Sequence, residues 1–372
     1  MKTAILLANL ILVGTTVSAL EPSDDFRRLD QNKDGKLTKD EFYDPFSDPV
    51  FRKIDTDKDG SVSVEEGQAF LDGHRCQQTL VPLWKHHLIR AAFDFPYAAT
   101  FKPSQRLHIY LPTTPKNDDP LPVVAIIHRR LERGQTAFNL LTSLVESGEY
   151  AGVAIGSRLE KREAIWPGQI HDCKAAIRWL RANAKTFNLD PDRIGVTGFY
   201  SGGHLAAMLG TSGDVESLEG DLGEYPNVSS RVACVVDLFG QTDFLTLGGS
   251  HNSRKSREAF LLGGAIQENK DAARSASPTT FVSKDDPPFM LIHGTNDQNI
   301  PFDQSERLHA ALLKAEVESV LIPIAGGEQV RWIDYWDLAP EVVERMRQFF
   351  DKHLLGKDVM VSEEPIKPKK GR

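Results

Sequence analysis

Six short apolar runs, separated by amphipathic stretches, constrain the fold of most of this 372-residue chain. They begin beyond residue 90 and lie at 123–128, 152–157, 193–198, 231–239, 288–293 and 319–324. Near-continuous apolar runs of this length are typical of strands that are buried on both faces, with helices covering each face. The sequence therefore predicts an α/β fold built on a doubly wound, mostly parallel sheet.

The amphipathic stretches predict the covering helices. Over 169–187 the apolar residues recur at spacings of three and four, which predicts one buried helical stripe; they are Ile170, Cys173, Ile177, Leu180, Ala184 and Phe187. Pro340 precedes a second apolar-periodic run and predicts the first turn of a last helix.

The first nineteen residues have the pattern of a secretory signal, with Lys2, an apolar run over 4–14 and a small-residue cleavage site at 17–19. We expect a secreted, periplasmic or extracellular protein, with an uncleaved anchor as the alternative. No later stretch is a transmembrane candidate. The net charge of −8 becomes −9 once Lys2 is removed, which argues against a nucleic-acid partner. Three scattered cysteines are too few for a disulfide framework or a zinc site.

The change in composition along the chain predicts five regions. We expect a signal peptide at 1–19, an acidic module at 20–72, a linker at 73–95, the α/β body at 96–355 and a disordered polar tail at 356–372. The oligomeric state is not predicted by any of these features.

Two twelve-residue segments in the acidic module fit the pattern D-x-[DN]-x-[DN]-G-x5-E at every defining position. Such a loop supplies hard oxygen ligands, with a glycine at the sharp turn. The expected ligands of the first loop are Asp30, Asn32, Asp34, the carbonyl of Lys36, Thr38 and Glu41. Those of the second are Asp55, Asp57, Asp59, the carbonyl of Ser61, Ser63 and Glu66. We predict two Ca²⁺ sites; the alternative is an acidic turn that fits by chance.

The module resembles EF-hand proteins, in which the residue at position 8 of each loop joins the two loops through a short β-bridge. Leu37 and Val62 occupy that position here. The second loop carries four carboxylates against three in the first, and ligand charge raises affinity, so we expect it to fill first. Because the 13 residues between the loops include Pro45 and Pro49, we expect a structural role rather than sensor-like opening.

Residues 106–355 resemble secreted α/β-hydrolase esterases of the acetyl-esterase, feruloyl-esterase and acetylxylan-esterase kind. The motifs that carry the resemblance are IHDCKAAIRWLRANA (170–184), DPDRIGVTG (190–198), GGHLAA (202–207), VVDLFGQTDF (235–244), SPTTFVSKDDPPF (277–289) and HGTND (293–297). The resemblance implies a nucleophilic serine on a sharp strand-to-helix turn, followed along the chain by an aspartate and a histidine.

Three catalytic positions of the resembled family carry other residues here. The family pattern G-x-S-A-G-G-H-L-A places Tyr200 where the serine belongs, and Glu328 stands where the histidine is expected. The glycine-rich oxyanion segment reads His128-Arg129-Arg130-Leu131. Asp297 is retained at the acid position, where a simple turn role is the alternative. Ser201 is an alternative nucleophile, although it lies one residue past the turn.

These substitutions favour a catalytically inactive hydrolase fold that binds a ligand or partner. Two alternatives remain open: an active carboxylic-ester hydrolase acting on acylated plant or algal polysaccharide, through Ser201 or through Tyr200 with Glu328, and a calcium-dependent structural protein. We expect a carbohydrate or acyl-ester ligand. Arg129, Arg130 and Arg158, together with Tyr200, predict a preference for an anionic ligand, unless these arginines are simply a solvated surface.

Overall fold

The computed structural model describes residues 26–27, 30, 32–38, 41, 51, 54–69, 81–83, 86–100, 102, 104–128, 135–158, 164–213, 215–328, 333–334, 337–338 and 340–367. The chain divides into two compact units, Met1–Phe70 and Leu71–Arg372. Within the described residues, no helix combines the length and the apolar character that crossing a membrane requires.

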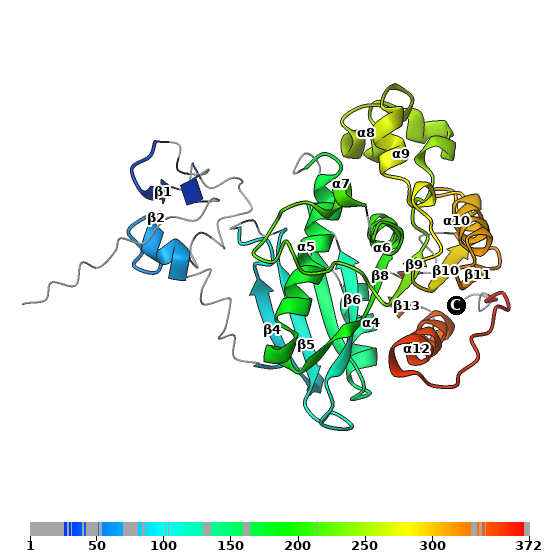
Figure 1. Ribbon diagram of the computed structural model, residues 1–372, viewed down its shortest axis with the longest axis horizontal. Coiled ribbons are helices and arrows are strands. Elements are labelled where there is room, and N and C mark those ends of the chain that lie inside the picture. The colour runs from blue at the N-terminus through cyan, green and yellow to red at the C-terminus, as the bar shows by residue number, and fades with distance from the viewer. Residues whose placement is uncertain are drawn as a thin grey trace, which may run out of the picture. The chain divides into compact units, whose positions relative to one another are not determined.

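A nine-stranded sheet forms the centre of the larger unit (Figure 1). Its strand order is β11-β10-β9-β8-β6-β7-β5-β4-β3, parallel from β11 to β7 and antiparallel from β7 to β3. The parallel strands end at one edge, so the loops that follow them converge there. The strands are β3 (Val81–Leu83), β4 (His86–Phe95), β5 (Leu107–Pro112), β6 (Leu121–His128), β7 (Ala151–Gly156), β8 (Leu189–Phe199), β9 (Cys234–Leu238), β10 (Phe289–Gly294) and β11 (Ser319–Ile324).

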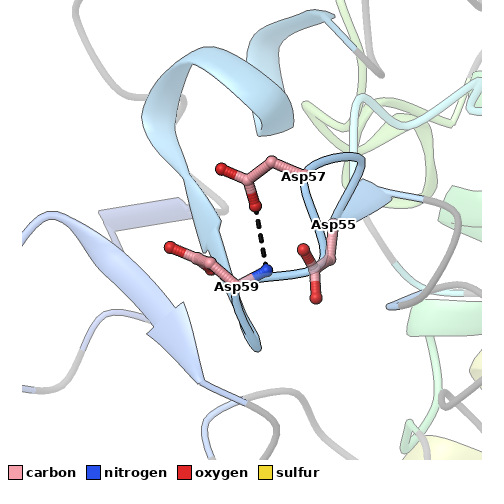
Figure 2. Close-up of side chains that lie close together, drawn as sticks. All are labelled: Asp55, Asp57 and Asp59. Atoms are coloured by element: carbon pink, nitrogen blue, oxygen red, sulfur yellow. Dashed lines mark hydrogen bonds between the residues drawn. The ribbon is translucent and has the colours of Figure 1, made fainter.

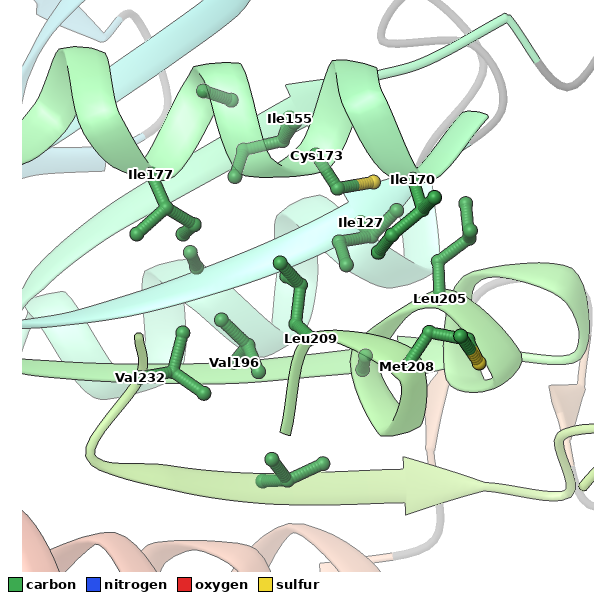
Figure 3. Close-up of a cluster of buried hydrophobic side chains, with 14 of the residues drawn as sticks. Ile127, Ile155, Ile170, Cys173, Ile177, Val196, Leu205, Met208, Leu209 and Val232 are labelled. Atoms are coloured by element: carbon green, nitrogen blue, oxygen red, sulfur yellow. The ribbon is translucent and has the colours of Figure 1, made fainter. Parts of the chain in front are cut away.

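Helices cover both faces of the sheet and enclose two apolar cores. One core is shared with α5 (Gly168–Ala182), α6 (Ser201–Thr211) and α10 (Asp303–Lys314). The other is shared with α4 (Gln135–Val145) and α12 (Pro340–Leu355). Figure 3 shows part of the first core, where Ile170, Cys173 and Ile177 of α5 lie close to strand residues and to Leu205 and Leu209 of α6.

The remaining elements are short. They are η2 (Ala184–Phe187), α7 (Glu216–Glu219), η3 (Phe244–Thr246), η4 (Gly249–Asn252), α8 (Arg257–Leu262), η5 (Ile266–Glu268), α9 (Lys270–Ser275), η6 (Pro278–Thr280), β12 (Ile333–Asp334) and β13 (Asp337–Leu338). Most of them lie between β9 and β10, which makes this connection a long excursion from the sheet.

The α/β fold with a mostly parallel sheet is confirmed, and each of the six apolar runs contains or overlaps a strand. The stripe over 169–187 is divided between α5 and η2, and the last helix begins at Pro340 as predicted. Period-based predictions succeed here because these elements are buried along one stripe or on both faces.

Two boundary predictions are wrong. Residues 81–83 and 86–95, expected within a linker, form β3 and β4 and pair with the sheet. Only part of β4 is buried, with Ile89 and Ala91 covered and Leu88 exposed, so it lacks the continuous apolar run of a central strand.

The described part of the C-terminal tail is also ordered rather than disordered. Ile366 forms a parallel bridge to Ile324 of β11 and is only 5% exposed. Its backbone amide donates to the carbonyl of Pro323, and the amide of Ala325 donates to its carbonyl. One apolar residue in a polar segment is too weak a signal for composition to detect. Residues 368–372 lie outside the described residues.

In the smaller unit, β1 (Lys36–Thr38) and β2 (Ser61–Ser63) form a two-stranded antiparallel sheet. Leu37 pairs with Val62, and both side chains are fully buried. The predicted bridge between the two loops is therefore confirmed. The signal-peptide prediction concerns residues 1–19, which lie outside the described residues.

Candidate active site and calcium loops

The second acidic loop brings three carboxylates together. Asp55, Asp57 and Asp59 each place a carboxylate oxygen within 4.8 Å of the other two (Figure 2). Gly60 makes the turn with φ of +87°, a conformation that side chains with a Cβ rarely adopt. The amide of Asp59 donates to Asp57 at 3.0 Å, and the amide of Gly60 donates to Asp55 at 3.2 Å. These bonds orient the acids into one cluster.

The donor set fits a hard divalent cation. Asp55 is only 7% exposed, and its Oδ1 is buried without a hydrogen-bond partner, which is costly for a carboxylate oxygen unless a cation satisfies it. Carboxylate oxygens are the ligands that Ca²⁺ prefers. Glu66 at the end of the loop accepts from the amides of Thr56 and Ser63 at 2.8 and 3.0 Å, so it lies against the loop.

The first loop repeats this arrangement. Gly35 has φ of +79° and its amide donates to Asp30 at 3.0 Å, while the amide of Asp34 donates to Asn32 at 2.8 Å. Glu41 accepts from the amide of Thr38 at 2.9 Å, as Glu66 does from Ser63. The two loops are thus built alike, although the described residues form a three-acid cluster only in the second.

The elbow lies between β8 and α6. Tyr200 stands at its tip with φ of +55° and ψ of −116°, a strained conformation for a residue with a side chain. Its amide donates to the carbonyl of Leu238 at 3.0 Å, and its carbonyl accepts from His204 at 2.9 Å. A Cβ on Gly202 would lie 2.3 Å from the carbonyl oxygen of Ile127, so a larger residue there would push the turn away from β6. Ser201 begins the helix, one residue beyond the tip.

Asp297 follows β10 and holds its own turn together. Its Oδ1 accepts from the amides of Asn299 and Ile300 at 2.7 and 3.0 Å. Its Oδ2 is buried 3.5 Å from Nε2 of His293. That histidine is fully buried and contacts Ser305 through Nδ1. Asp297 is therefore held by the amides of its own turn and lies close to His293.

Glu328 lies on the loop after β11, which contacts the loop that carries Asp297. The amide of Asn296 donates to the carbonyl of Gly327 at 2.9 Å, and the amide of Gly326 donates to Oγ1 of Thr295 at 2.9 Å. Glu328 itself is half-buried. The structure thus brings the acid loop and the Glu328 loop together at the carboxyl edge of the sheet.

The candidate oxyanion segment is described only in part. His128 ends β6 at the same edge and is half-buried, whereas Arg129 and Arg130 lie outside the described residues.

Comparison with known proteins identifies the fold. Residues 107–312 match the BD-FAE family. The chain belongs to the BD-FAE family. Residues 24–47 and 46–71 each match the EF hand, which agrees with the two acidic loops.

Curated relatives of this BD-FAE protein include Esterase LipQ and Esterase LipC of Mycobacterium tuberculosis. They are 30% identical over 50% of this chain and 34% identical over 43% of it. The matches cover 43% and 41% of those relatives, so the chain spans less than half of their length.

Solved structures show the same fold. One is a truncated form of a carbohydrate esterase from gut microbiota, 31% identical with a TM-score of 0.60; the match covers 71% of this chain and 96% of that one. Another is a bifunctional GH43-CE from Bacteroides eggerthii, 33% identical with a TM-score of 0.63; it covers 71% of this chain and 38% of that one.

A cavity of about 710 Å³ opens beside Tyr200 in this BD-FAE fold. Its other described walls come mainly from the excursion between β9 and β10, including His251, Arg257 and Glu258. The guanidinium carbon of Arg257 lies 5.4 Å from the centroid of the Tyr200 ring. Burial, and then the negative charge of Glu258, raise the pKa of the Tyr200 phenol, so the phenol stays protonated near neutral pH.

Sequence reasoning missed this wall. His251 and Glu258 form an ion pair at 3.0 Å, and Nε2 of His251 lies 2.8 Å from the carbonyl oxygen of Asn299. The polar segment HNSRKSRE at 251–258 is the sequence feature that could have indicated this wall. Nothing in its spacing predicts that it lies near the elbow. Only the folded excursion brings the two segments together.

The structure does not support the expected role of Arg158 in ligand binding. Its guanidinium forms a bidentate pair with Asp172, through Nη2 at 2.7 Å and Nε at 2.9 Å. Asp172 is fully buried and also accepts from Gln105. Arg158 is therefore an internal counter-ion that connects the loop after β7 to α5, and it does not line the described cavity.

Proposed function

We propose that this chain is an exported, calcium-binding member of the BD-FAE family that binds a carbohydrate or acyl-ester ligand without hydrolysing it. The observation that carries the proposal is Tyr200 at the tip of the elbow, in the backbone geometry in which a hydrolase of this fold presents its nucleophile. The fold thus supports the proposal through the backbone geometry of a single residue, Tyr200.

A phenol at this position is a poor substitute for the serine–histidine pair. Burial raises the pKa of Tyr200 further above its ordinary value of 10.0. A carboxylate at the histidine position, as Glu328 offers, is roughly six pKa units less basic than a phenolate and cannot keep the phenol deprotonated. The proton relay of a serine esterase therefore has no counterpart in Tyr200 and Glu328.

The histidine nearest to Tyr200 in the described cavity is also a poor base. His251 faces two hydrogen-bond acceptors, the carboxylate of Glu258 and the carbonyl oxygen of Asn299. Both ring nitrogens of His251 are therefore engaged by groups other than Tyr200 and Ser201. Ser201 lies one residue past the tip. His251, whose ring nitrogens are engaged elsewhere, is also the histidine of the described cavity lining that would have to act as its base.

The ligand class rests on the cavity and on the relatives. The cavity volume is in the range of small-ligand sites, and its polar lining suits a hydroxylated molecule. Two solved relatives are named as a carbohydrate esterase and as a GH43-CE protein. We therefore propose that this chain binds a saccharide, either acylated or free. Export and calcium binding complete the proposal and rest on the leader pattern and the two loops.

The experiment compares hydrolysis with binding. Purified protein is assayed on p-nitrophenyl acetate and on acetylated and feruloylated xylan, with and without calcium, beside the Ser201→Ala and Tyr200→Phe variants. We expect the parent protein and both variants to release product at the rate of a protein-free blank. Calorimetric titration with the same xylans is expected to give saturable heat. Turnover that either substitution abolishes would overturn the proposal and favour an active esterase.

A further inference from the structure

We propose that the cavity beside Tyr200 binds the anionic group of a saccharide, a uronate carboxylate or a sulfate ester, through Arg257. The inference rests on the proposed function, because it assigns a ligand chemistry to the same cavity. It differs from the sequence-based expectation in the residues that carry it, which come from the excursion between β9 and β10.

The wall of the cavity carries more basic than acidic side chains. The described lining includes three basic side chains, His251, Lys255 and Arg257, and one acidic side chain, Glu258. Glu258 is 3% exposed, and its carboxylate is directed to Nδ1 of His251 at 3.0 Å. This contact holds the acidic group inside the wall. The positive charges of Lys255 and Arg257 are left facing the cavity.

Lys255 and Arg257 have no acidic partner among the described residues. Other exposed arginines of this part of the chain do have one. Arg254, three residues before Arg257, pairs with Glu268 at 2.7 Å, and Arg274 pairs with Asp271 at 2.7 Å. Unlike Arg254 and Arg274, Arg257 has no acidic partner among the described residues, and it lines the cavity.

Tyr200 has a role of its own in this arrangement. Its ring lies under the guanidinium of Arg257, whose central carbon is 5.4 Å from the ring centroid. Stacking on the ring restricts the guanidinium while leaving its five N–H donors available to a ligand. Two oxygens of a carboxylate or sulfate match that planar fork. The residue that replaces the nucleophile would therefore act as a positioning residue for an anion-binding arginine.

Calorimetry with the full-length protein tests the inference. The probes are trigalacturonate, its methyl-esterified neutral form and a sulfated galactose trisaccharide, so that carboxylate, neutral and sulfate ligands are compared at one chain length. We expect either or both charged probes to bind and the neutral probe to bind at least tenfold more weakly. Binding is also expected to weaken as NaCl is raised, since the contact is between charges.

Two arginines on one segment provide the matched variants. Arg257→Gln should weaken binding of the charged probe by roughly 10- to 100-fold, the value of a hydrogen bond to a charged group. Arg254→Gln, outside the described lining, should leave affinity unchanged within about twofold. Tyr200→Leu removes the ring beneath the guanidinium and should weaken binding by roughly threefold, the value of an exposed cation–π contact.

Several results would overturn the inference. They are equal binding of neutral and charged probes, no binding of any probe, or equal losses in the Arg257 and Arg254 variants. Equal binding of the neutral probe would leave the proposed function intact. Hydrolysis of acylated xylan would refute the proposed function while the charge preference could still be measured, so the two failures are distinguishable.

Discussion

At the scale of single residues, Tyr200 has the backbone geometry of a strand-to-helix elbow but a side chain that differs from serine in its chemistry. Positive φ at a residue with a side chain costs about 1–3 kcal/mol and persists only where the surroundings over-determine it. Here the amide of Tyr200 is bound to Leu238 and its carbonyl to His204. The backbone of the turn is therefore held by these bonds and does not depend on the side chain at its tip.

This reasoning predicts how the elbow responds to repair. Tyr200→Ser alone should not hydrolyse p-nitrophenyl acetate above the blank, because the serine has no base. Adding Glu328→His should raise the rate above that of the single variant by on the order of 100-fold, the lower contribution of a general base. Initial rates of both variants check this. If the single variant is as fast as the double one, position 328 is not the base position.

Arg158 predicts a different outcome, because its partner is buried. Arg158→Ala would leave the carboxylate of Asp172, which is fully buried, without its counter-ion. Removing one partner of a buried pair costs about 3–5 kcal/mol. We expect urea unfolding to show that loss, with a similar loss in Asp172→Ala. Arg254→Ala, whose pair is exposed, should change stability by less than about 1 kcal/mol. Equal effects at 158 and 254 would contradict the internal role.

At the scale of elements, the two acidic loops act as one unit because β1 and β2 pair directly. Lys36 of the first loop also binds Asp59 of the second at 3.1 Å, so a cation-binding residue of one loop contacts the other. Both loops have the same glycine turn, and Glu41 and Glu66 each accept from the amide three residues earlier. The loops differ in the number of carboxylates that they supply.

The calcium prediction follows from that difference. Calorimetric titration of the metal-free protein should show two binding events, with the tighter one abolished by Glu66→Gln and the weaker one by Glu41→Gln. The physical reason is that the second loop supplies four carboxylates against three. Unchanged calcium uptake in both variants would refute the assignment of these loops as calcium sites.

The composition of the C-terminal segment predicted disorder, but its described part is ordered. It continues past α12 and returns to cover the free edge of β11 through Ile366. Covering an exposed strand edge is a common protection against pairing with other chains. The segment therefore belongs to the fold of the larger unit.

Ile366→Ala tests this directly. The side chain is 5% exposed, and truncating a buried isoleucine costs about 2–4 kcal/mol, so the urea midpoint of the larger unit should fall. Met360→Ala in the same segment is the control, since Met360 is 92% exposed and its truncation should change stability by less than about 0.5 kcal/mol. Equal midpoints for the two variants would contradict a packed tail.

At the scale of the whole molecule, burial sets the response of the larger unit to acid. Burial lowers the pKa of His204 from 6.5 to about 4, and it raises the pKa of Asp237 from 3.8 to about 7. The unfolded chain binds the His204 proton more readily, so that group costs stability as pH falls from 6.5 to 4. Asp237 has the opposite sign, because the folded state binds its proton more readily over the same range.

The two effects are separated by His204→Gln. The stability of the parent protein minus that of the variant should fall by roughly 3 kcal/mol between pH 7 and pH 4, since each pKa unit corresponds to about 1.4 kcal/mol. Urea unfolding at several pH values measures this difference. A difference that is independent of pH would show that His204 titrates alike in the folded and unfolded states.

Prediction from sequence succeeded where burial is periodic and local. The central strands, the stripe of α5 and the bridge between Leu37 and Val62 are all encoded in short-range patterns. It failed for β3 and β4 and for the bridge at Ile366, where a partly exposed strand and a single buried residue give little periodic signal. It also did not predict that His251, Arg257 and Glu258 would border Tyr200.

The sequence alone determined the α/β class and the two acidic loops, and it predicted Tyr200, Asp297 and Glu328 as residues of the candidate site, because each depends on residue identity at fixed spacing. The tertiary structure alone decided what surrounds the elbow. It paired Arg158 with a buried acid and brought Arg257 over the ring of Tyr200. The physical reason is that both arrangements depend on contacts between segments 14 to 57 residues apart, which the long excursion and the packing of the sheet create.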